Sequence, residues 1–341
     1  MIKYIDLFSG VGGFRKALTD VAKNKRLHTR CVGFSEIDKD AIKTYRANFR
    51  ADRGELELGD ISKIKTSDLP DFDLLFAGFP CQPFSIMGKQ DGFTDKRGEL
   101  FFDLARVIGD KQPRFFILEN VRGLFTMQGG EVYKRILSIL QLKLGYHISV
   151  FILNSRDYGV PQTRRRLYIL GFKNREDSML NPPPVVDLKE TQWPTVWHLL
   201  ERKVDDKYYL SERLKKTILM NGSGNFKAKS EANQLIARPL SATMHKMHRA
   251  CQDNYYSDRF IFGKYDKNKE EVILNKTMPD RLRRITPLEA FRLQGFEDSF
   301  VANAKRAGVS DTQLFRQAGN AVTVSTVKSV LLSANLNNFD R

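Results

Sequence analysis

Residues 2–14 read IKYIDLFSGVGGF, and this stretch decides the fold. Its first half is an apolar run, which is typical of a strand buried on both faces of a sheet. Gly10, Gly12 and Gly13 follow at once, and they allow the backbone to turn sharply and to approach a ligand closely. The stretch therefore predicts a strand, a glycine-rich turn and a helix, which together open an α/β fold.

Strand and helix patterns alternate through the first half of the chain. The alternation predicts a mostly parallel, doubly wound, Rossmann-like sheet in which the last two strands form an antiparallel pair. We expect strands at 2–8, 30–34, 73–77, 115–118, 147–153 and 166–172, and helices at 14–22, 39–49, 100–108, 132–144, 287–293 and 320–333.

The pattern changes after Phe172. Residues 181–186 read NPPPVV, which cannot form a helix and is typical of a linker. From there to about Met278 the sequence is irregular and rich in Lys, Arg, Asn, Ser and Gly. We therefore expect a second, smaller domain built from loops and short strands.

Composition narrows the class of protein. The 341 residues carry a net charge of +16, which suggests a polyanionic partner. No window is long and apolar enough to cross a bilayer, and the first residues lack a secretion signal, so we expect a soluble cytoplasmic protein. The three cysteines are far apart and the five histidines form no ligand set, so we expect neither a disulfide framework nor a metal site.

Polar residues follow the first strands where an open sheet binds ligands. Glu36 comes after the second strand and is suited to accept hydrogen bonds from ribose hydroxyls, and Asp60 is suited to accept from an adenine amino group. Taken alone, each is better explained as an ordinary helix N-cap or a surface carboxylate. Arg15 stands where a dinucleotide fingerprint needs its third glycine, which disfavours a nicotinamide enzyme. Together these features favour a cofactor that contains a nucleoside.

A chemical centre is predicted at the next two strand ends. Residues 73–85 read DLLFAGFPCQPFS, in which Pro80 and Pro83 flank Cys81 and restrict the backbone around the thiol. The following strand, FFILENV, carries Glu119 to the same edge of the sheet. A thiol that faces a carboxyl group suits attack on an electron-poor ring whose nitrogen is protonated at the same time. A small buried cysteine and a capping carboxylate are the bland alternatives.

Three consecutive arginines follow in QTRRRLYILG, residues 162–171. Alternation along a strand places Arg164 and Arg166 on one face and Arg165 on the other. Arginines beside a thiol favour the thiolate and hold carboxylates or phosphates. A solvated basic strand is the alternative, and it suits Arg165 best. A cysteine protease is disfavoured, because no histidine lies at a matching strand end.

These motifs, in this order, resemble those of the DNA (cytosine-5)-methyltransferases of bacterial restriction–modification systems. The resemblance covers nearly the whole chain and extends to RRITPLEAFRLQGF and QAGNAV near its end. It implies that Cys81 is the attacking thiol, that Glu119 binds N3 and the exocyclic amine of cytosine, and that Arg164 and Arg166 support the substrate and the catalytic loop.

The resemblance also implies ligands. The cofactor is S-adenosylmethionine, which becomes S-adenosylhomocysteine, and the partner is double-stranded DNA. The expected cofactor contacts are Phe8, Ser9, Gly10, Gly12, Gly13, Glu36, Ile37, Asp60, Ile61, Pro80, Leu100, Asn320, Ala321 and Val322. The expected DNA contacts are Gln82, Ser85, Lys89, Thr243, Lys246 and Arg249, with Asn254 as a further candidate for base contact.

The family's organisation predicts a catalytic domain at 1–180 completed by 316–341, a target-recognition domain at 185–282 and a hinge region at 283–315. Thr243 corresponds to the family's Thr-Leu dipeptide, but Met244 replaces the leucine. The segment 86–98 is expected to be the loop that closes over DNA. We further expect a monomer that acts in the nucleoid, and a restriction endonuclease that acts separately.

The implied reaction is addition of Cys81 to C6 of a flipped-out cytosine, methylation at C5 and elimination of the thiol. Two alternatives stay open besides the disfavoured oxidoreductase. A tRNA-methylating branch of the family keeps the same motifs, although its usual CFT-type segment is missing here and the basic middle region favours DNA. A catalytically silent DNA-binding homologue is the other alternative, and the intact motif residues count against it.

Overall fold

The computed structural model divides the chain into two compact units, each described by itself. Unit 1 comprises 1–153, 165–184 and 326–341, and unit 2 comprises 154–164 and 185–325. The chain therefore passes between the units at four points. The structure describes residues 1–80, 99–179, 181–220, 222–223, 226–227, 231–246, 248–249, 251–334 and 336.

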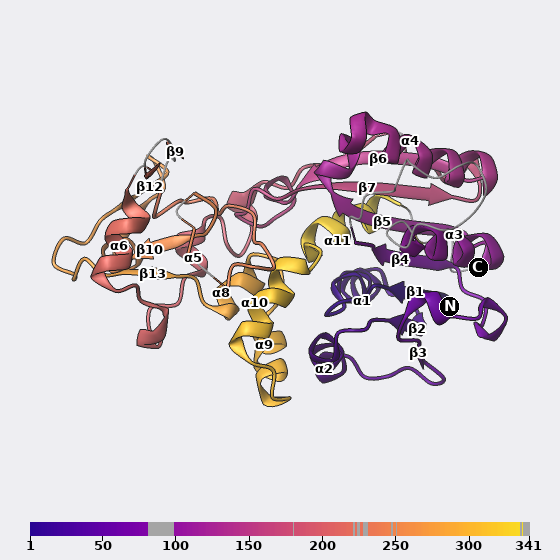
Figure 1. Cartoon of the computed structure of the whole chain (residues 1–341), viewed down its shortest axis with the longest axis horizontal. Helices are drawn as coiled ribbons and strands as arrows, with labels where there is room; N and C mark the ends of the chain where they lie inside the picture. Colours follow the sequence, from indigo (N-terminus) through magenta and orange to yellow (C-terminus); the bar gives the residue numbers. More distant parts are fainter. Residues whose placement is uncertain are drawn as a thin grey trace. The chain divides into compact units, whose positions relative to one another are not determined.

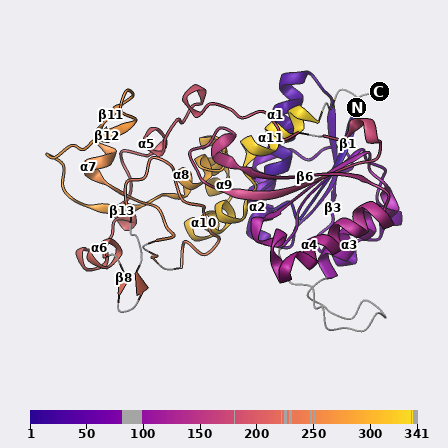
Figure 2. The same cartoon turned by 90° about the horizontal axis from the view of Figure 1, so that it is seen from above.

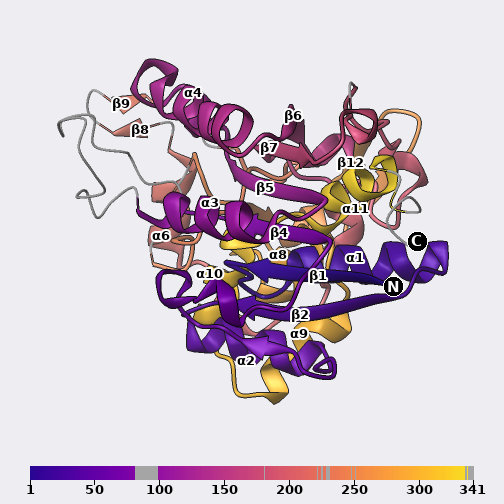
Figure 3. The ribbon, with the colours of Figure 1, turned by 90° about the vertical axis from the view of Figure 1, so that its right-hand side faces the viewer.

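Unit 1 is built on a seven-stranded sheet of order β3-β2-β1-β4-β5-β7-β6 (Figures 1 and 3). Its strands β1 to β5 pair in parallel, whereas β7 runs antiparallel to β5 and lies between β5 and β6. The strands are β1 Ile2–Leu7, β2 Thr29–Ser35, β3 Leu56–Glu57, β4 Leu74–Gly78, β5 Phe115–Val121, β6 His147–Asn154 and β7 Arg165–Phe172. The predicted α/β class is thus confirmed.

Helices cover both faces of this sheet, which makes it doubly wound (Figure 2). On one face Phe14 stacks on Phe76 with ring centroids 5.3 Å apart, which fixes the first helix against β4. On the other face, apolar side chains of the third and fourth helices join one core cluster with β1, β4, β5 and β7. The helices of unit 1 are α1 Gly13–Lys25, α2 Lys39–Asn48, α3 Glu99–Lys111, α4 Glu131–Ser138 and most of α11 Val324–Ser333.

Unit 2 contains short strands and several helices. Its strands are β8 Gly222–Ser223, β9 Phe226–Lys227, β10 Tyr255–Ser257, β11 Lys264–Asp266, β12 Glu271–Ile273 and β13 Leu282–Arg284, and they pair in twos as β8-β9, β10-β13 and β11-β12. Its helices are α5 Val196–Leu199, α6 Glu212–Leu219, α7 Asp258–Ile261, α8 Pro287–Arg292, α9 Asp298–Arg306 and α10 Asp311–Asn320. The functional division into catalytic, recognition and hinge segments stays a prediction.

A buried ion pair holds the end of the irregular region. Arg283 and Glu289 are both fully buried, and their side chains make two hydrogen bonds of 2.6 and 2.8 Å. Glu289 also accepts from the backbone N–H of Thr286, while the Thr286 hydroxyl accepts from Glu289 N–H and so completes a capping box at the start of α8. The motif RRITPLE is therefore a structural unit that begins this helix.

The predicted helix at 320–333 is wrong at its start. Asn320 is the last residue of α10, Ala321 is extended, and α11 begins only at Val324. The interruption has a tertiary cause, because Thr323 donates from its hydroxyl to Gln294 and Val324 N–H donates to the Gln294 carbonyl. The predicted helix at 132–144 is also modified, since α4 ends at Ser138 and continues as a π-helix over Ile139–Lys143.

None of the helices among the described residues is long and apolar enough to span a membrane.

Candidate active site

One backbone hydrogen bond and two that involve a side chain join three strand ends at one edge of the sheet in unit 1. The N–H of Ser9 donates to the carbonyl of Ser35 over 2.9 Å, and the N–H of Gly10 donates to the Glu36 carboxylate over 2.8 Å. The Ser35 hydroxyl in turn donates to the carbonyl of Gly59 over 2.6 Å. The glycine-rich turn, Glu36 and the residue before Asp60 are thus brought together, as the strand order requires.

Glu36 is held by backbone donors and does not cap the second helix. Its Oε1 accepts from the N–H groups of Ile37 and Asp38, both over 2.8 Å. The cap of α2 is instead Asp38, which accepts from Asp40 and Ala41. A carboxylate fixed by three backbone donors keeps lone pairs for further donors such as hydroxyl groups.

Asp60, in contrast, does act as a cap. It precedes a short 3-10 helix, Ile61–Lys63, and its carboxylate accepts from the N–H and the hydroxyl of Ser62 over 3.0 and 2.8 Å. These bonds lower the pKa of the Asp60 carboxyl below its ordinary value. The group therefore stays ionised near neutral pH, and only one of its oxygens is taken up by the cap. Ile61 beside it is 2% exposed and belongs to the core.

The glycine-rich turn fits a nucleoside ligand. The hydroxyl of Ser9 is buried and has no hydrogen-bond partner among the described residues. Gly10 has a φ of +53°, and a Cβ placed on it would meet nothing within 4 Å, so the space beside it is open. Ile37 leaves 73% of its surface exposed next to Glu36. These features suit a nucleoside, which is a base attached to a hydroxyl-bearing sugar. They offer it an open backbone, an unused buried hydroxyl and an apolar face beside a carboxylate.

Arg15, which departs from the dinucleotide fingerprint, has a structural explanation. It is 4% exposed, pairs with Glu55 over 3.0 Å and donates to the hydroxyl of Tyr45 over 3.0 Å. The close approach of α1 to α2 depends instead on Gly12, because a Cβ there would lie 2.4 Å from the ring of Phe49. The interhelical contact therefore needs a glycine at position 12, and Arg15 adds an ion pair and a hydrogen bond to it.

The chemical edge of the sheet is formed by β4 and β5. These strands are parallel, and Glu119 lies in register with Gly78, three residues before Cys81. Arg166 on β7 forms an ion pair with Glu119, with 3.2 Å between Nε and Oε1. Both side chains are largely buried, so a protein dipole and charge replace water around the carboxylate. The structure thus brings two of the predicted catalytic residues into contact.

Asn120 is a residue that the sequence reasoning missed. It is 3% exposed, and its Nδ2 donates to the carbonyl of Phe79 over 2.9 Å. This bond ties β5 to the chain two residues before Cys81. A polar residue inside the otherwise apolar run FFILENV was the available signal, since such a side chain needs a buried partner.

Several predicted residues lie outside the described part of the chain. They are Cys81 itself and three of the expected DNA contacts, Gln82, Ser85 and Lys89, together with the predicted closing loop at 86–98. Of their neighbours, Pro80 is exposed and Leu100 packs in α3 against the core cluster.

The first arginine of QTRRR has different partners from the last. Arg164 belongs to unit 2, where it donates to the carbonyls of Leu240, Gly319 and Ala321 over 2.9 to 3.0 Å. Arg165 is exposed, whereas Arg164 is buried, which agrees with the predicted alternation. The two predicted supporting arginines therefore act on separate partners.

The remaining predicted contacts also lie in unit 2. Asn320 is exposed, whereas Ala321 and Val322 are 8% and 7% exposed. The hydroxyl of Thr243 accepts from Arg249 Nη2 over 2.9 Å. Lys246 is exposed, and Asn254 is buried with hydrogen bonds to the backbone of Arg238.

Within the described residues there is no group of three or more His, Cys, Asp or Glu side chains that is arranged to hold a metal ion.

A doubly wound sheet with these features at its carboxyl edge matches the methyltransferase fold. The structure is similar to that of the Entamoeba histolytica methyltransferase EhMeth, with a TM-score of 0.72, 22% identity and 99% of each chain covered. It is also similar to the Dnmt2 methyltransferase of S. pombe, with a TM-score of 0.71, 20% identity and the same coverage. The chain therefore shares the fold of these two methyltransferases.

The sequence defines the family within this class. The family model of the C-5 cytosine-specific DNA methylases matches residues 2–334, and the chain belongs to this family of DNA cytosine-5 methyltransferases. It is 38% identical over 334 residues to the type II methyltransferase M.NlaX of Neisseria lactamica, covering 97% of this chain and 95% of that protein. It is 38% identical over 335 residues to M1.ScrFI of Lactococcus lactis subsp. cremoris, covering 96% and 76%.

Proposed function

We propose that this chain transfers a methyl group from S-adenosylmethionine to C5 of a flipped-out cytosine in one short duplex DNA sequence. We further propose that it is the modification enzyme of a type II restriction–modification system and that its cognate endonuclease acts separately. The observation that carries the proposal is the Arg166–Glu119 pair, in which Glu119 is in register with Gly78, three residues before Cys81 in the sequence. The type II methyltransferases among the relatives support the biological role.

The proposed chemistry uses two side chains of unit 1. The Cys81 thiolate adds to C6 of the cytosine, while the Glu119 carboxyl group donates a proton to N3, so that the C5–C6 double bond is lost and C5 becomes nucleophilic. C5 then takes the methyl group, a base removes the C5 proton, elimination of the thiolate restores the C5–C6 double bond, and the N3 proton returns to the Glu119 carboxylate. Arg166 orients Glu119 toward the ring through the ion pair.

The cofactor, when bound, supplies an electrophilic methyl group. In the proposal Glu36 accepts from the ribose hydroxyls, Asp60 accepts from the adenine amino group, and Ile37 packs against the base. The fixed position of Glu36 and the unused Ser9 hydroxyl support this assignment. The remaining contacts proposed are the turn from Phe8 to Gly13, Ile61, Pro80, Leu100 and the Asn320–Val322 segment.

The proposed substrate is duplex DNA, read in the major groove by residues within 185–282. The net charge of +16 supports a polyanionic partner. Binding should weaken steeply with salt, because each phosphate contact releases counterions. The slope of log K against the logarithm of the salt concentration should be about −0.9 for each phosphate contact. An affinity for DNA that does not change between low and high salt would contradict binding through contacts between basic side chains and phosphates.

The experiment that tests the proposal is bisulfite sequencing of plasmid DNA from cells that express the chain. Protected cytosines in one recurring short context are expected, and they would give the activity and the recognition sequence together. A soluble protein without protection would refute duplex DNA as the substrate. Transfer of label from radioactive cofactor to tRNA would then support the RNA-methylating alternative, and no transfer to either would support the silent homologue.

A further inference from the structure

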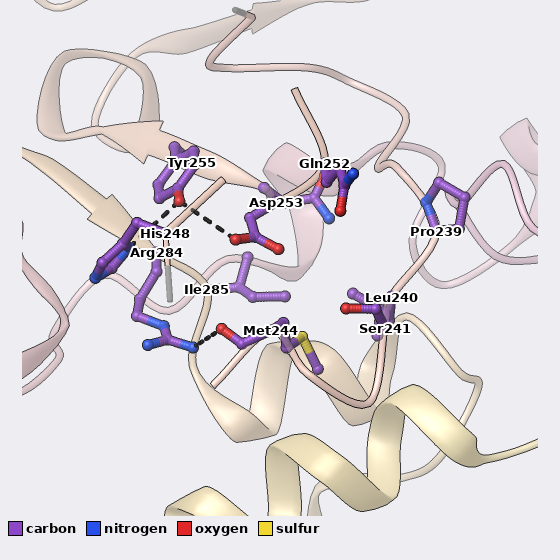
Figure 4. Close-up of a pocket in the computed structure, with 11 residues that line it drawn as sticks. Pro239, Leu240, Ser241, Met244, His248, Gln252, Asp253, Tyr255, Arg284 and Ile285 are labelled. Atoms are coloured by element: carbon purple, nitrogen blue, oxygen red, sulfur yellow. Dashed lines mark hydrogen bonds between the residues drawn. The ribbon is translucent and has the colours of Figure 1, made fainter. Parts of the chain in front are cut away.

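The segment Leu240–Met244 of unit 2, here called the 240–244 loop, is held by side chains that are remote in the sequence. Gln162 accepts from Leu240 N–H over 3.0 Å, and Arg164 donates to the Leu240 carbonyl over 2.9 Å. At the other end, Arg284 donates to the Met244 carbonyl over 2.7 Å (Figure 4). All three bonds go to the backbone of the loop, so these bonds themselves do not depend on the identity of its side chains.

The same loop lies directly on the end of α10. A Cβ added to Gly319 would come within 2.3 Å of the Ser241 carbonyl carbon and 2.4 Å of the Ala242 nitrogen, so only a glycine permits this approach. Arg164 completes the connection, since its Nη2 donates to the Gly319 and Ala321 carbonyls over 3.0 Å each. One buried guanidinium therefore binds the loop and the residues on both sides of Asn320.

The outer part of the loop is ordered separately. Arg249 Nη2 donates to the hydroxyls of Ser241 and Thr243, each over 2.9 Å, and its backbone N–H donates to Asp253 over 2.9 Å. Thr243 is exposed, whereas Met244 is 6% exposed and lines the small pocket drawn in Figure 4. The loop is thus anchored by its backbone and by Met244, while Thr243 stays accessible.

We propose that the 240–244 loop and the segment Gly319–Val322 behave as one mechanical body, in which Arg164 and Gly319 are positioning residues that couple target recognition to cofactor binding. The inference rests on the proposed function, in which Thr243 faces DNA and Asn320–Val322 contact the cofactor. A ligand that orders one segment orders the other through these contacts. By linkage, cofactor and DNA then tighten each other's binding, and couplings of this kind are typically about 5- to 150-fold.

Hydrogen exchange of the full chain tests the coupling without DNA. Binding of S-adenosylhomocysteine should slow amide exchange in three places, namely the turn at 8–13, the segment at 319–322 and the 240–244 loop. Slowing at 8–13 and 319–322 with an unchanged 240–244 loop would overturn the coupling and leave the proposed function intact. No slowing at 8–13 would refute the cofactor assignment, and the coupling would be rejected with it.

Two variants measure the coupling itself. The quantity is the affinity for S-adenosylhomocysteine with saturating sheared plasmid DNA divided by the affinity without it. We expect a ratio of at least about fivefold in the wild type and a ratio near one in Gly319→Ala. If Gly319→Ala does not fold, Arg164→Met takes its place, with exposed Arg165→Met as its matched control. A wild-type ratio near one, or an undiminished ratio in a folded variant of Gly319 or Arg164, would refute the proposal.

Discussion

The carboxyl edge of the sheet in unit 1 and the 240–244 loop of unit 2 are built in opposite ways. At the edge, parallel strands deliver Gly10, Glu36 and Glu119 to one side of the sheet, and backbone pairing fixes their relative positions. The loop has no strand partner, and it is fixed by Gln162 and Arg164, which are 76 to 78 residues away. Residues at the edge are therefore positioned by the sheet itself, whereas the loop depends on polar side chains of unit 2 that are committed to structure.

The comparison predicts the largest effect for Cys81→Ser. A hydroxyl is a far weaker nucleophile than a thiolate, so methyl transfer should fall by at least about 10³-fold. Folding and DNA binding should persist, because the change removes no packing volume of note. Single-turnover methylation and a gel-shift titration measure the two properties, with Cys251→Ser as the control. Near-normal turnover in Cys81→Ser would refute Cys81 as the nucleophile.

The next effect is expected for Glu119→Gln. The amide keeps the shape and can still accept from Arg166, but it cannot donate a carboxylic acid proton. The rate should drop by about 10² to 10⁴, which is the typical contribution of a positioned general acid. The urea midpoint should stay where it is. Glu131→Gln, at the exposed start of α4, is the control, and an active Glu119→Gln enzyme would remove the carboxyl group from the mechanism.

In unit 2, Arg283→Met should lower stability, whereas the two substitutions in unit 1 should lower activity and leave stability unchanged. The change leaves Glu289 as a buried charge without its bidentate partner. Removing one member of a buried pair typically costs about 3 to 5 kcal/mol of unfolding free energy. Urea denaturation measures this loss, and Arg213→Met on the exposed face of α6 should change stability by less than about 0.5 kcal/mol. Equal stability of the two variants would undermine the contrast between the regions.

The smallest effect concerns Asp6, which is an exception inside unit 1. Burial raises the pKa of the Asp6 carboxyl well above its usual range, against the opposing charge of Arg15. The folded state therefore holds a proton that the unfolded chain has lost. The contribution of this carboxyl group to the unfolding free energy falls as the pH rises above its pKa in the unfolded chain, which is near 4. The fall is at most about 1.4 kcal/mol per pH unit.

Asp6→Asn removes this titration. The stability of the wild type relative to the variant should therefore decline between pH 4 and 7, as measured by urea midpoints at a series of pH values. A difference that stays flat, or that rises with pH, would show that burial does not dominate the environment of Asp6.

The sequence predicted unit 1 well because its signals are local. Each apolar run ends in a turn, and the polar residue after it must lie at the ligand edge, which is how Glu36 and Glu119 were identified. The alternative in which Glu36 caps a helix was wrong, because Asp38, two residues later, caps that helix. Asn120 was missed, although its place in an apolar strand was visible.

Prediction was weaker where distant side chains decide the backbone. The break at Ala321 is supported by Arg164 and Gln294, although Gly319 and Asn320, which often end helices, were a local signal for it. Helices α9 and α10 were not predicted, although their buried residues, such as Phe300 with Ala304 and Leu314 with Ala318, have helical spacing. The expected DNA contact by Arg249 stays a prediction, and the structure adds that its Nη2 is already bonded to Ser241 and Thr243.

The last helix has a consequence for synthesis on the ribosome. All strands of the large sheet are complete by Phe172, but α11 contributes Val327, Val330 and Leu331 to the core and pairs with α1 through Lys328 and Asp20. About 150 further residues must be translated before that apolar surface is covered, which takes roughly 8 to 30 s at 5–20 residues per second. The nascent sheet is thus exposed to misassembly for this interval, and a chaperone that shields it would raise the yield of folded enzyme.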